Sequence, residues 1–586
     1  MVMFRTKLCA ACAAAAVFFN LNDVYGQKID PVVEVTRDYE GRLMVVHKPL
    51  QTMPVADSLQ HFDLEFEYSV NDSPYKGTFE FNPLLLNIVP GPSENDGRVF
   101  RLRAGAGYAL QPQLDFVWSP RFDGSRFRMS LYGTHGSYIG RYRGIGSWAD
   151  GGRTVLDAGS KGNRQSLYEG HGYSGYDMET KAGISGAAGW EGGEFTFDVG
   201  YLGIAMKDTS LVRHYDALDV RLRARSDGGP DRLFFYDAAV GYRYGNDNMS
   251  FPAARRSFLT EHLFSLDASL GPVFSESSRA LLDIGFNFAD YAGLSGEYAG
   301  DFSVTPRYVF RKGRWSLDLG VKFAVTMHNT PSGGMYDISK GQFVYPDVRI
   351  GFAAVREYLD IYLLATGGDR VSSWSGFLAS DRFYNPAASS SYPLGNTVER
   401  VSVFLGLDGN IASRLGYDFR AGYVNYASAF LDGVSFAGNQ PQYAPGFAAC
   451  QMFRADLKLV WKSDAVSAGA DLSCRITDIL SHSSGLFGPA AFAGRLHATY
   501  NWRGRIYAGA DCRLSTSRNS VVRMEPADID VRIPGYADLG VNAGYRFSRS
   551  FSVWARAGNL LNMTVQDVPL HARPGINFTA GICLEL

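Results

Sequence analysis

Apolar and polar side chains alternate through the last part of the chain, Tyr536 to Leu586. In its first segment Leu539 and Val541 share one parity, whereas Asp538 and Asn542 lie on the other. Successive side chains of a β-strand point to opposite faces of the sheet, so one face suits lipid and the other suits water. The pattern predicts three closing strands of an outer-membrane β-barrel that ends at the C-terminus.

The clearest single strand is expected over Trp315–His328. Large apolar residues such as Leu319 and Phe323 occupy every second position, and Asp318 and Lys322 occupy positions between them. A charge that faces lipid at mid-depth costs roughly 2–4 kcal/mol. The face that carries Asp318 and Lys322 is therefore expected to line the lumen.

Segments of this kind recur from Arg98 onward and are joined by alternately short and long connections. We predict an all-β fold, a transmembrane antiparallel β-barrel of about 22 strands. Short turns of such barrels face the periplasm, so the long connections are expected outside the cell and both termini in the periplasm. The long connections are expected at Gly140–Tyr173, Asn329–Gly341, Gly368–Thr397, Ala429–Pro445, Thr516–Pro534 and Met563–Pro574.

Composition agrees with a barrel. Beyond the N-terminus no run approaches the roughly 20 apolar residues that a membrane helix needs. Without such helices, a chain in lipid satisfies its backbone hydrogen bonds only as a closed barrel. The formal net charge of −2 excludes a strongly basic nucleic-acid-binding protein, so no nucleic acid is expected as a partner.

The N-terminus has the pattern of a secretory signal. Arg5 and Lys7 precede an apolar run, Leu8 to Phe19, and small residues follow. Such a pattern predicts a signal peptide over residues 1–26. The remaining organisation is then a short periplasmic or lumenal segment, residues 27–97, followed by the barrel, residues 98–586.

Both ends of the predicted barrel resemble one known family. The stretch "GYRFSRSFSVWARAGNLLNMTVQ" followed by "PGINFTAGICLEL" resembles the closing strands of TonB-dependent outer-membrane receptors, and Arg101–Pro120 resembles their first hairpin. The resemblance implies a barrel that moves a solute across the outer membrane. The last residues also resemble the signal read by the barrel assembly machinery, which implies that machinery as a partner and assigns the signal to Thr579, Gly581, Leu584 and Leu586.

The segment before the barrel departs from this family. Its receptors carry a globular plug inside the lumen, and residues 27–97 are too few for one of the usual size. Near the start of the segment, Val32, Val33, Glu34, Val35 and Thr36 resemble a TonB-contacting box. TonB coupling is thus left open, and the lumen is expected to be closed by the N-terminal segment, by loops or by a partner protein.

The sequence contains no recognisable catalytic, cofactor or metal site. The HExxH, GxSxG and phosphate-loop motifs are absent in the context that they require, and an enzyme is not expected. Aromatic residues in two long connections could stack on a sugar or hold a partner, although such residues also form the interfacial girdle of these barrels. They are Trp148, Tyr168, Trp374 and Phe377.

Three functions remain open at this point. The first is a barrel that translocates or admits a solute. The second is a non-transporting structural subunit that anchors an envelope complex through a periplasmic or outer-membrane partner. The third and most distant is a membrane-embedded hydrolase that uses His135 or His328 with a carboxylate. Nothing in the sequence names a substrate.

Overall fold

The computed structural model describes residues 98–586, apart from positions 109, 123–125, 159–171, 227–232, 251–256, 294–297, 329–340, 357, 385–394, 412–413, 439 and 481–483. Every described residue belongs to one compact unit, which lies within residues 77–586. The predicted signal peptide and the TonB-box-like segment Val32–Thr36 lie outside the described residues.

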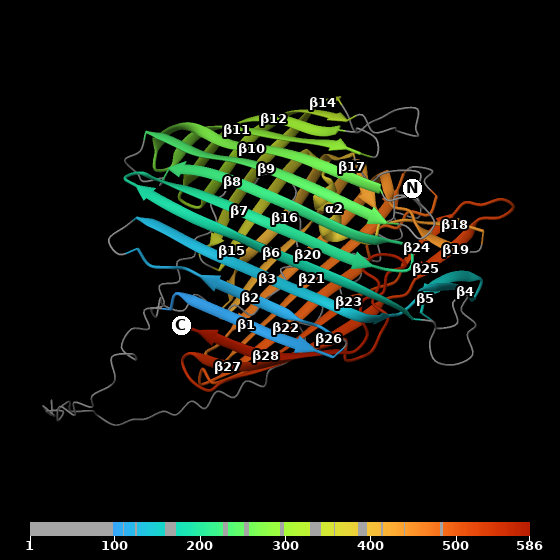
Figure 1. Cartoon of the computed structure of the whole chain (residues 1–586). Coiled ribbons are helices and arrows are strands. Elements are labelled where there is room, and N and C mark those ends of the chain that lie inside the picture. The colour runs from blue at the N-terminus through green and yellow to red at the C-terminus, as the bar shows by residue number, and fades with distance from the viewer. Residues whose placement is uncertain are drawn as a thin grey trace, which may run out of the picture. The chain divides into compact units, whose positions relative to one another are not determined.

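Within the described residues, 22 strands form one closed antiparallel sheet (Figure 1), as predicted. Strands that follow one another along the barrel wall pair with one another, and β1 pairs with β28 to close it. The barrel strands are β1 (Phe100–Gly107), β2 (Gln113–Trp118), β3 (Phe127–Tyr142), β6 (Tyr173–Trp190), β7 (Gly193–Lys207), β8 (Val212–Ser226), β9 (Phe234–Ser250), β10 (Ser257–Ser275), β11 (Ser278–Ala292), β12 (Tyr298–Lys312), β13 (Trp315–His328), β14 (Gly341–Val355), β15 (Leu359–Ser372), β16 (Gly395–Ile411), β17 (Leu415–Leu431), β20 (Gly446–Lys462), β21 (Val466–Ile479), β22 (Phe492–Trp502), β23 (Ile506–Ser515), β26 (Tyr536–Arg546), β27 (Phe551–Gly558) and β28 (Asn577–Glu585).

The alternation seen in the sequence sets the two faces of the wall. In β13 the side chains of Leu319 and Phe323 are 42% and 51% exposed on the outer face, whereas Ala324 and Thr326 on the inner face are each 3% exposed. A register shifted by one residue would exchange these faces. The strand has the bounds that the sequence predicts, Trp315–His328.

The seam of the barrel is also where the sequence places it. Leu584 lies opposite Leu102, and Ile582 lies opposite Ala104. The backbone N–H of Leu586 donates to the carbonyl of Phe100 at 2.8 Å. Because both neighbours of β28 are paired, the described barrel has no open edge at its closing strand.

The connections divide the barrel into two ends. Tight turns join strands at the end that also holds the start of β1 and the C-terminus, and we call it the turn end. Gly313 and Gly504, with φ of +67° and +66°, make two of these turns, a backbone conformation that favours glycine. The long connections all emerge from the opposite end, which we call the loop end.

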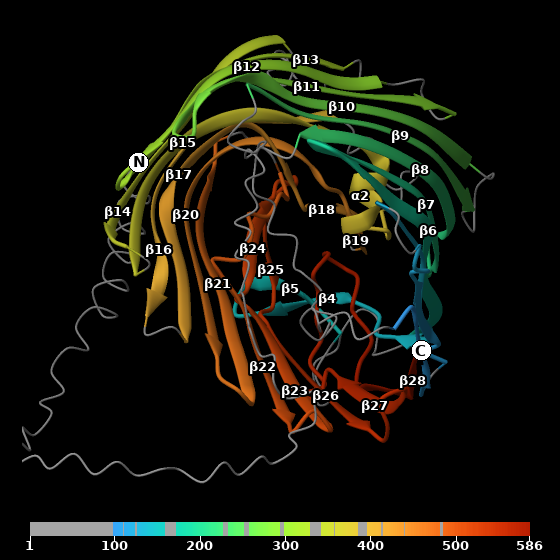
Figure 2. The same cartoon turned by 90° about the vertical axis from the view of Figure 1, so that its left-hand side faces the viewer.

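The loops contain structure of their own. One short helix, α2 (Trp374–Ser380), follows β15, and a hairpin of β18 (Val434–Ala437) and β19 (Gln440–Tyr443) follows β17. Viewed along the barrel (Figure 2), these elements lie inside the ring of strands. Two further hairpins join into a four-stranded sheet of order β24-β25-β5-β4, made of β24 (Arg518–Val522), β25 (Ile529–Ile533), β5 (Arg153–Asp157) and β4 (Gly146–Asp150).

The expected boundaries of three long connections are wrong by a few residues. Strand β3 continues to Tyr142, β15 to Ser372 and β17 to Leu431. These strand ends no longer alternate between apolar and polar residues: Ala429, Phe430 and Leu431 at the end of β17 are all apolar, so the pattern hides them. Among the described residues, no helix is long and apolar enough to cross a membrane.

Candidate functional site

The inward-folded connections form one assembly at the loop end, which we call the lumen cap. It comprises residues 143–158, 373–384, 432–445, 480–491, 516–535 and 559–576 as far as they are described. In its first apolar cluster, Trp374, Phe377 and Leu378 of α2 are 0%, 7% and 0% exposed. They pack on inward-facing residues of β7 to β11, namely Ile204, Met206, Tyr215, Ala217, Met249, Leu259, Ala289 and Tyr291.

The N-terminus of α2 rests on a carboxylate of the barrel wall. Glu261 of β10 is fully buried and accepts hydrogen bonds from the backbone N–H groups of Trp374 at 2.7 Å and Ser375 at 3.1 Å. Ser373 caps the helix, since its hydroxyl accepts from the N–H of Gly376 at 3.1 Å. The first N–H groups of a helix lack partners within it and favour a negative charge nearby. Glu261 therefore fixes where the helix begins.

A buried ion pair of the barrel wall also contacts the segment 373–384. Asp247 of β9 and Arg213 of β8 have side chains that are 0% exposed and lie 3.0 Å apart. The indole N–H of Trp374 donates to Asp247 at 2.8 Å. Arg213 also donates to the backbone carbonyls of Arg382 and, at 2.8 Å, Tyr384. The Arg213–Asp247 pair thus links two wall strands to both ends of the segment 373–384, Asp247 to Trp374 and Arg213 to Arg382 and Tyr384.

Arg382 adds a second attachment to the wall. Its guanidinium lies 2.8 Å from Asp177 and 2.5 Å from Glu179, both on β6. The side chain of Arg382 is 18% exposed. An ion pair with little solvent around it is screened weakly. The pairs of Arg382 therefore hold the segment 373–384 to β6, in addition to the buried contacts with Glu261, Asp247 and Arg213.

A second apolar cluster forms where the four-stranded sheet meets the other loops. Its buried members are Ile145, Leu156, Val434, Phe487, Val522, Val531, Ile533 and Ala572. The side-chain amide of Gln566 donates to the carbonyl of Leu156 at 2.7 Å. Arg518 pairs with Asp432 at 2.6 Å and donates to the carbonyl of Asp567 at 3.0 Å. These bonds join four separate connections into one unit.

His571 lies between the two clusters. Its ring stacks on Phe383 with 4.6 Å between centroids, and it lies 3.9 Å from a carboxylate oxygen of Asp208. Burial lowers the pKa of His571 to about 4, against the opposing effect of Asp208. Nearby, burial raises the pKa of Asp381 to about 7, although a hydrogen bond from the Tyr443 hydroxyl opposes this rise. The cap therefore holds two buried titratable groups with opposite shifts.

The inner wall below the cap is lined by charges. Arg307 lies 2.9 Å from Asp283 and 2.6 Å from Asp347, which joins strands β11, β12 and β14. Arg420 and Arg454 share Asp456 at 2.9 Å and 2.8 Å. Such a wall suits water and polar solutes, as in barrels with a polar interior.

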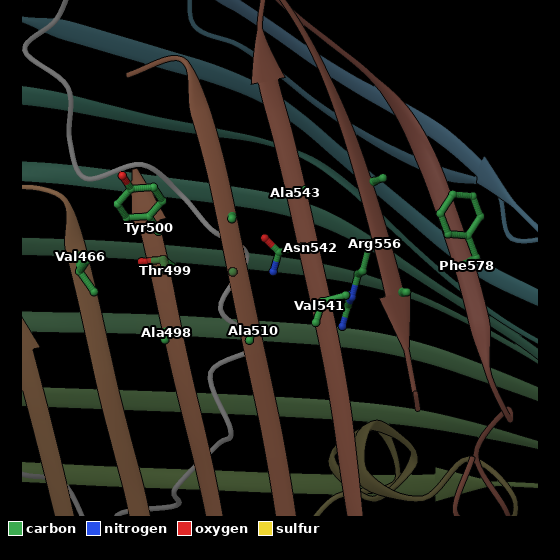
Figure 3. Close-up of a pocket in the computed structure, with 14 residues that line it drawn as sticks. Val466, Ala498, Thr499, Tyr500, Ala510, Val541, Asn542, Ala543, Arg556 and Phe578 are labelled. Carbon is green, nitrogen blue, oxygen red and sulfur yellow. The ribbon is translucent and has the colours of Figure 1, made fainter. Parts of the chain in front are cut away.

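A surface hollow lies on the opposite face of the wall (Figure 3). It has a volume of about 530 Å³ and spans β21, β22, β23, β26, β27 and β28. Most of its lining residues have outward parity and are small and apolar, such as Ala498, Ala510 and Ala543. This face suits lipid, so the hollow is not a candidate site for a polar solute.

Three of the four loop aromatics named from the sequence lie in the described part of the chain. Trp374 and Phe377 are buried in the first cluster, and their role in binding a solute or partner stays a prediction. Trp148 is half-buried on β4, and its indole nitrogen has no hydrogen-bond partner among the described residues. Tyr168 lies outside the described residues.

The residues assigned to the assembly signal lie in the seam. Thr579 is 3% exposed, and its hydroxyl donates to the side chain of Gln111 at 2.9 Å. A Cβ at Gly581 would lie 2.0 Å from the carbonyl of Ala104, so a larger residue does not fit there. Leu584 lies opposite residues of β1 and β27. Their role in assembly stays a prediction.

No catalytic or metal-binding arrangement is found in the described part of the chain. His135 on β3 lies 2.8 Å from the Thr180 hydroxyl, and His328 lies on β13, which does not adjoin β3. The described residues contain no group of three or more His, Cys, Asp or Glu that could hold a metal ion. The wall residues that position the cap, Glu261, Asp247 and Arg213, were not expected from the sequence, where they read as ordinary lumen-facing polar residues.

No protein-family model matches the chain, and no curated protein matches its sequence. Solved structures do match the fold. The FrpB iron transporter from Neisseria meningitidis (F5-1 variant) has a TM-score of 0.61 at 9% identity, over 83% of this chain and 82% of that chain. The copper transporter OprC has 0.59 at 11% identity over 83% and 80%. The siderophore receptor PiuA from Acinetobacter baumannii has 0.56 at 11% identity over 83% and 81%.

Proposed function

We propose that this chain is an outer-membrane barrel of the TonB-dependent-receptor type that admits a solute through a lumen closed at its loop end by the lumen cap. The observation that carries the proposal is the seating of α2 on Glu261, inside a wide barrel with a charged inner wall. A barrel that serves only as an anchor needs neither a polar passage nor a cap fixed across it.

The fold comparisons support the same class of function. The similar structures are described as a copper transporter, an iron transporter and a siderophore receptor. We extend to this chain only the shared feature, passage of a solute across the outer membrane, and we propose no enzyme activity. The substrate itself stays open.

We also propose how the chain is oriented in the membrane and processed. The loop end faces the outside, the turn end and both termini face the periplasm, and residues 1–26 are removed as a signal peptide. Residues 27–97 form a short periplasmic or lumenal segment whose Val32–Thr36 stretch is a candidate contact for TonB. Insertion depends on the barrel assembly machinery through the C-terminal strand.

Opening the passage requires the segment 373–384 to leave the wall. Its departure would strip Glu261 of two backbone donors and Asp247 of the Trp374 indole. Each hydrogen bond to a charged group contributes about 1.5–3 kcal/mol, so the closed state is strongly favoured. A solute or partner can open the cap only if it binds the open state better than the closed state.

Conductance in planar lipid bilayers tests the proposal. The test variant replaces residues 373–384 by a Gly-Ser linker of equal length, and the control variant makes the same replacement in the exposed turn Ser548–Ser550. We expect low conductance for the wild type and the control and a clearly higher conductance for the cap variant. Equal low conductance in all three proteins would contradict the proposal.

A second experiment tests the alternative that the chain is a non-transporting structural subunit. Deleting residues 27–92 while keeping the signal peptide removes most of the segment outside the barrel. A stoichiometric partner that copurifies with the full chain and is lost on deletion, together with unchanged conductance of the cap variant, would favour an anchoring subunit. Raised conductance on deletion would instead assign part of the lumen closure to the N-terminal segment.

A further inference from the structure

We propose that the inner wall of β17, β20 and β21 holds a binding site for a solute that carries oxyanion groups, such as phosphate, sulfate or carboxylate. The site consists of Arg420, Arg454, Arg475 and Thr477 around Asp456, and we call it the arginine cluster. The inference rests on the proposed function and deepens it, since it names the chemical class of solute that the lumen takes.

Arg454 lies directly opposite Arg475 in the register of β20 and β21. Like charges directly opposite one another destabilise a sheet. Several inward-facing arginines elsewhere in the described barrel instead face an acid across the ladder. Examples are Arg103 with Asp115, Arg221 with Asp198, Arg243 with Asp219 and Arg349 with Asp318.

One other pair of opposed arginines shows the contrast. Arg495 faces Arg513, but on their other sides these residues face Asp471 and Asp538. Arg454 and Arg475 have no such acid, because their other neighbours are Gly422 and, next to the end of β22, Ala491. Their repulsion is therefore not relieved by a facing carboxylate on the next strand.

The carboxylates within the cluster are engaged except for Oδ1 of Asp456, which is buried and has no hydrogen-bond partner among the described residues. One oxygen of Asp456 accepts from Arg420 at 3.0 Å and from Arg454 at 2.8 Å. Glu399, the other acid acting on Arg454, is held by the hydroxyls of Ser402 and Tyr426. Within the part of the chain that the structure describes, Arg475 has no ion-pair partner. Three guanidinium groups and two carboxylates leave one positive charge in excess.

Several donors in the cluster lack an acceptor. Nη2 of Arg454, Nε of Arg475 and the hydroxyl of Thr477 are buried and have no hydrogen-bond partner among the described residues. Thr477 is the next inward-facing residue after Arg475 on β21. Buried donors are normally paired, and an unpaired one calls for a missing water or ion. An oxyanion offers several acceptors at once, and guanidinium groups match its geometry.

The position of the cluster fits a solute that passes the cap. Strands β17 and β20, which carry Arg420 and Arg454, are the two strands joined by the β18–β19 hairpin of the lumen cap. The cluster thus lies on the wall beneath a part of the cap. A solute released from the cap would meet these arginines next.

Calorimetric titration of the purified full chain in detergent with inorganic pyrophosphate, at constant ionic strength, tests the site. We expect binding by the wild type and a loss of affinity of about tenfold or more for R475Q. R475K, which keeps the charge but not the fork of donors, should fall between them. The matched control is R221Q, because Arg221 is inward-facing, exposed and opposite Asp198, and it should bind like the wild type.

Folding is checked for every variant by heat-modifiable gel mobility. If R475Q does not fold, T477V removes an unpartnered donor without changing charge and should still weaken binding. Absence of pyrophosphate binding by the wild type, or equal loss in R475Q and R221Q, overturns the inference. The two hypotheses can fail separately, because binding does not require transport. If the cap variant conducts but the wild type does not bind pyrophosphate, only this inference is wrong. If the wild type binds pyrophosphate but the cap variant shows no raised conductance, only the proposed function is wrong.

Discussion

The indole N–H of Trp374 donates a 2.8 Å hydrogen bond to Asp247, a carboxylate with no exposed side-chain surface. The two residues come from a loop and from the barrel wall, so this bond couples the closure of the lumen to the barrel itself. Asp247 is in turn paired with Arg213. The cap thus completes the hydrogen bonding of an ion pair in the wall.

Asp247→Asn should loosen the cap. The substitution leaves Arg213 buried without its carboxylate, and losing one member of a buried pair costs about 3–5 kcal/mol. We expect a lower unfolding free energy in urea titrations in detergent and a higher conductance in planar bilayers. The control is Glu194→Gln, which breaks pairs with the exposed Arg128 and Arg225 and should cost at most about 1 kcal/mol for each pair. Equal effects of the two substitutions would show that Asp247 has no special role.

Leu319 and Lys322 test the two faces of the wall. Leu319→Arg places a charge on the outer face and should destabilise the barrel by roughly 2–4 kcal/mol, whereas Lys322→Ala changes the lumen face and should leave folding nearly intact. Heat-modifiable gel mobility of outer-membrane fractions reports the folded barrel. Comparable damage from both variants would mean that the assigned faces are wrong.

Deletion of Leu584–Leu586 tests the seam. The deletion removes the backbone partners of Phe100 and Leu102 and leaves polar groups of an open edge in lipid, at several kcal/mol for each group. We expect no folded protein in the outer membrane. The control Leu586→Ala keeps the backbone bonds and should reduce the folded fraction only partly. Normal membrane levels of the truncated chain would exclude β28 as the closing strand.

Alternation along the chain was enough to predict the wall but not the cap. In β13 every second residue is apolar, so one periodicity gives both the strand and its faces. In α2 the seven residues Trp374–Ser380 are too few to show a helical period. The contact between Glu261 and Trp374 joins residues 113 positions apart, and it depends on where β10 and β15 lie in the closed barrel. No local pattern in the sequence carries that information.

The opposite pKa shifts of Asp381 and His571 predict a pH dependence of the cap that single variants separate. The pKa of Asp381 is raised from 3.8 to about 7, so the closed cap binds more protons than an open one and becomes less stable as pH rises from about 4 to 7. The pKa of His571 is lowered from 6.5 to about 4. The open state then binds more protons in that window, and the closed cap becomes more stable as pH rises from about 4 to 6.5.

In the wild type these two effects oppose each other, so hydrogen exchange of residues 373–384 should change little between pH 4.5 and 6.5 once corrected for intrinsic rates. His571→Phe keeps a ring against Phe383 and leaves Asp381 to act alone, so protection of the segment should fall as pH rises. Asp381→Asn leaves His571 to act alone, so protection should increase with pH. The double variant should show no slope. Identical pH profiles in all four proteins would show that neither group titrates with the opening of the cap.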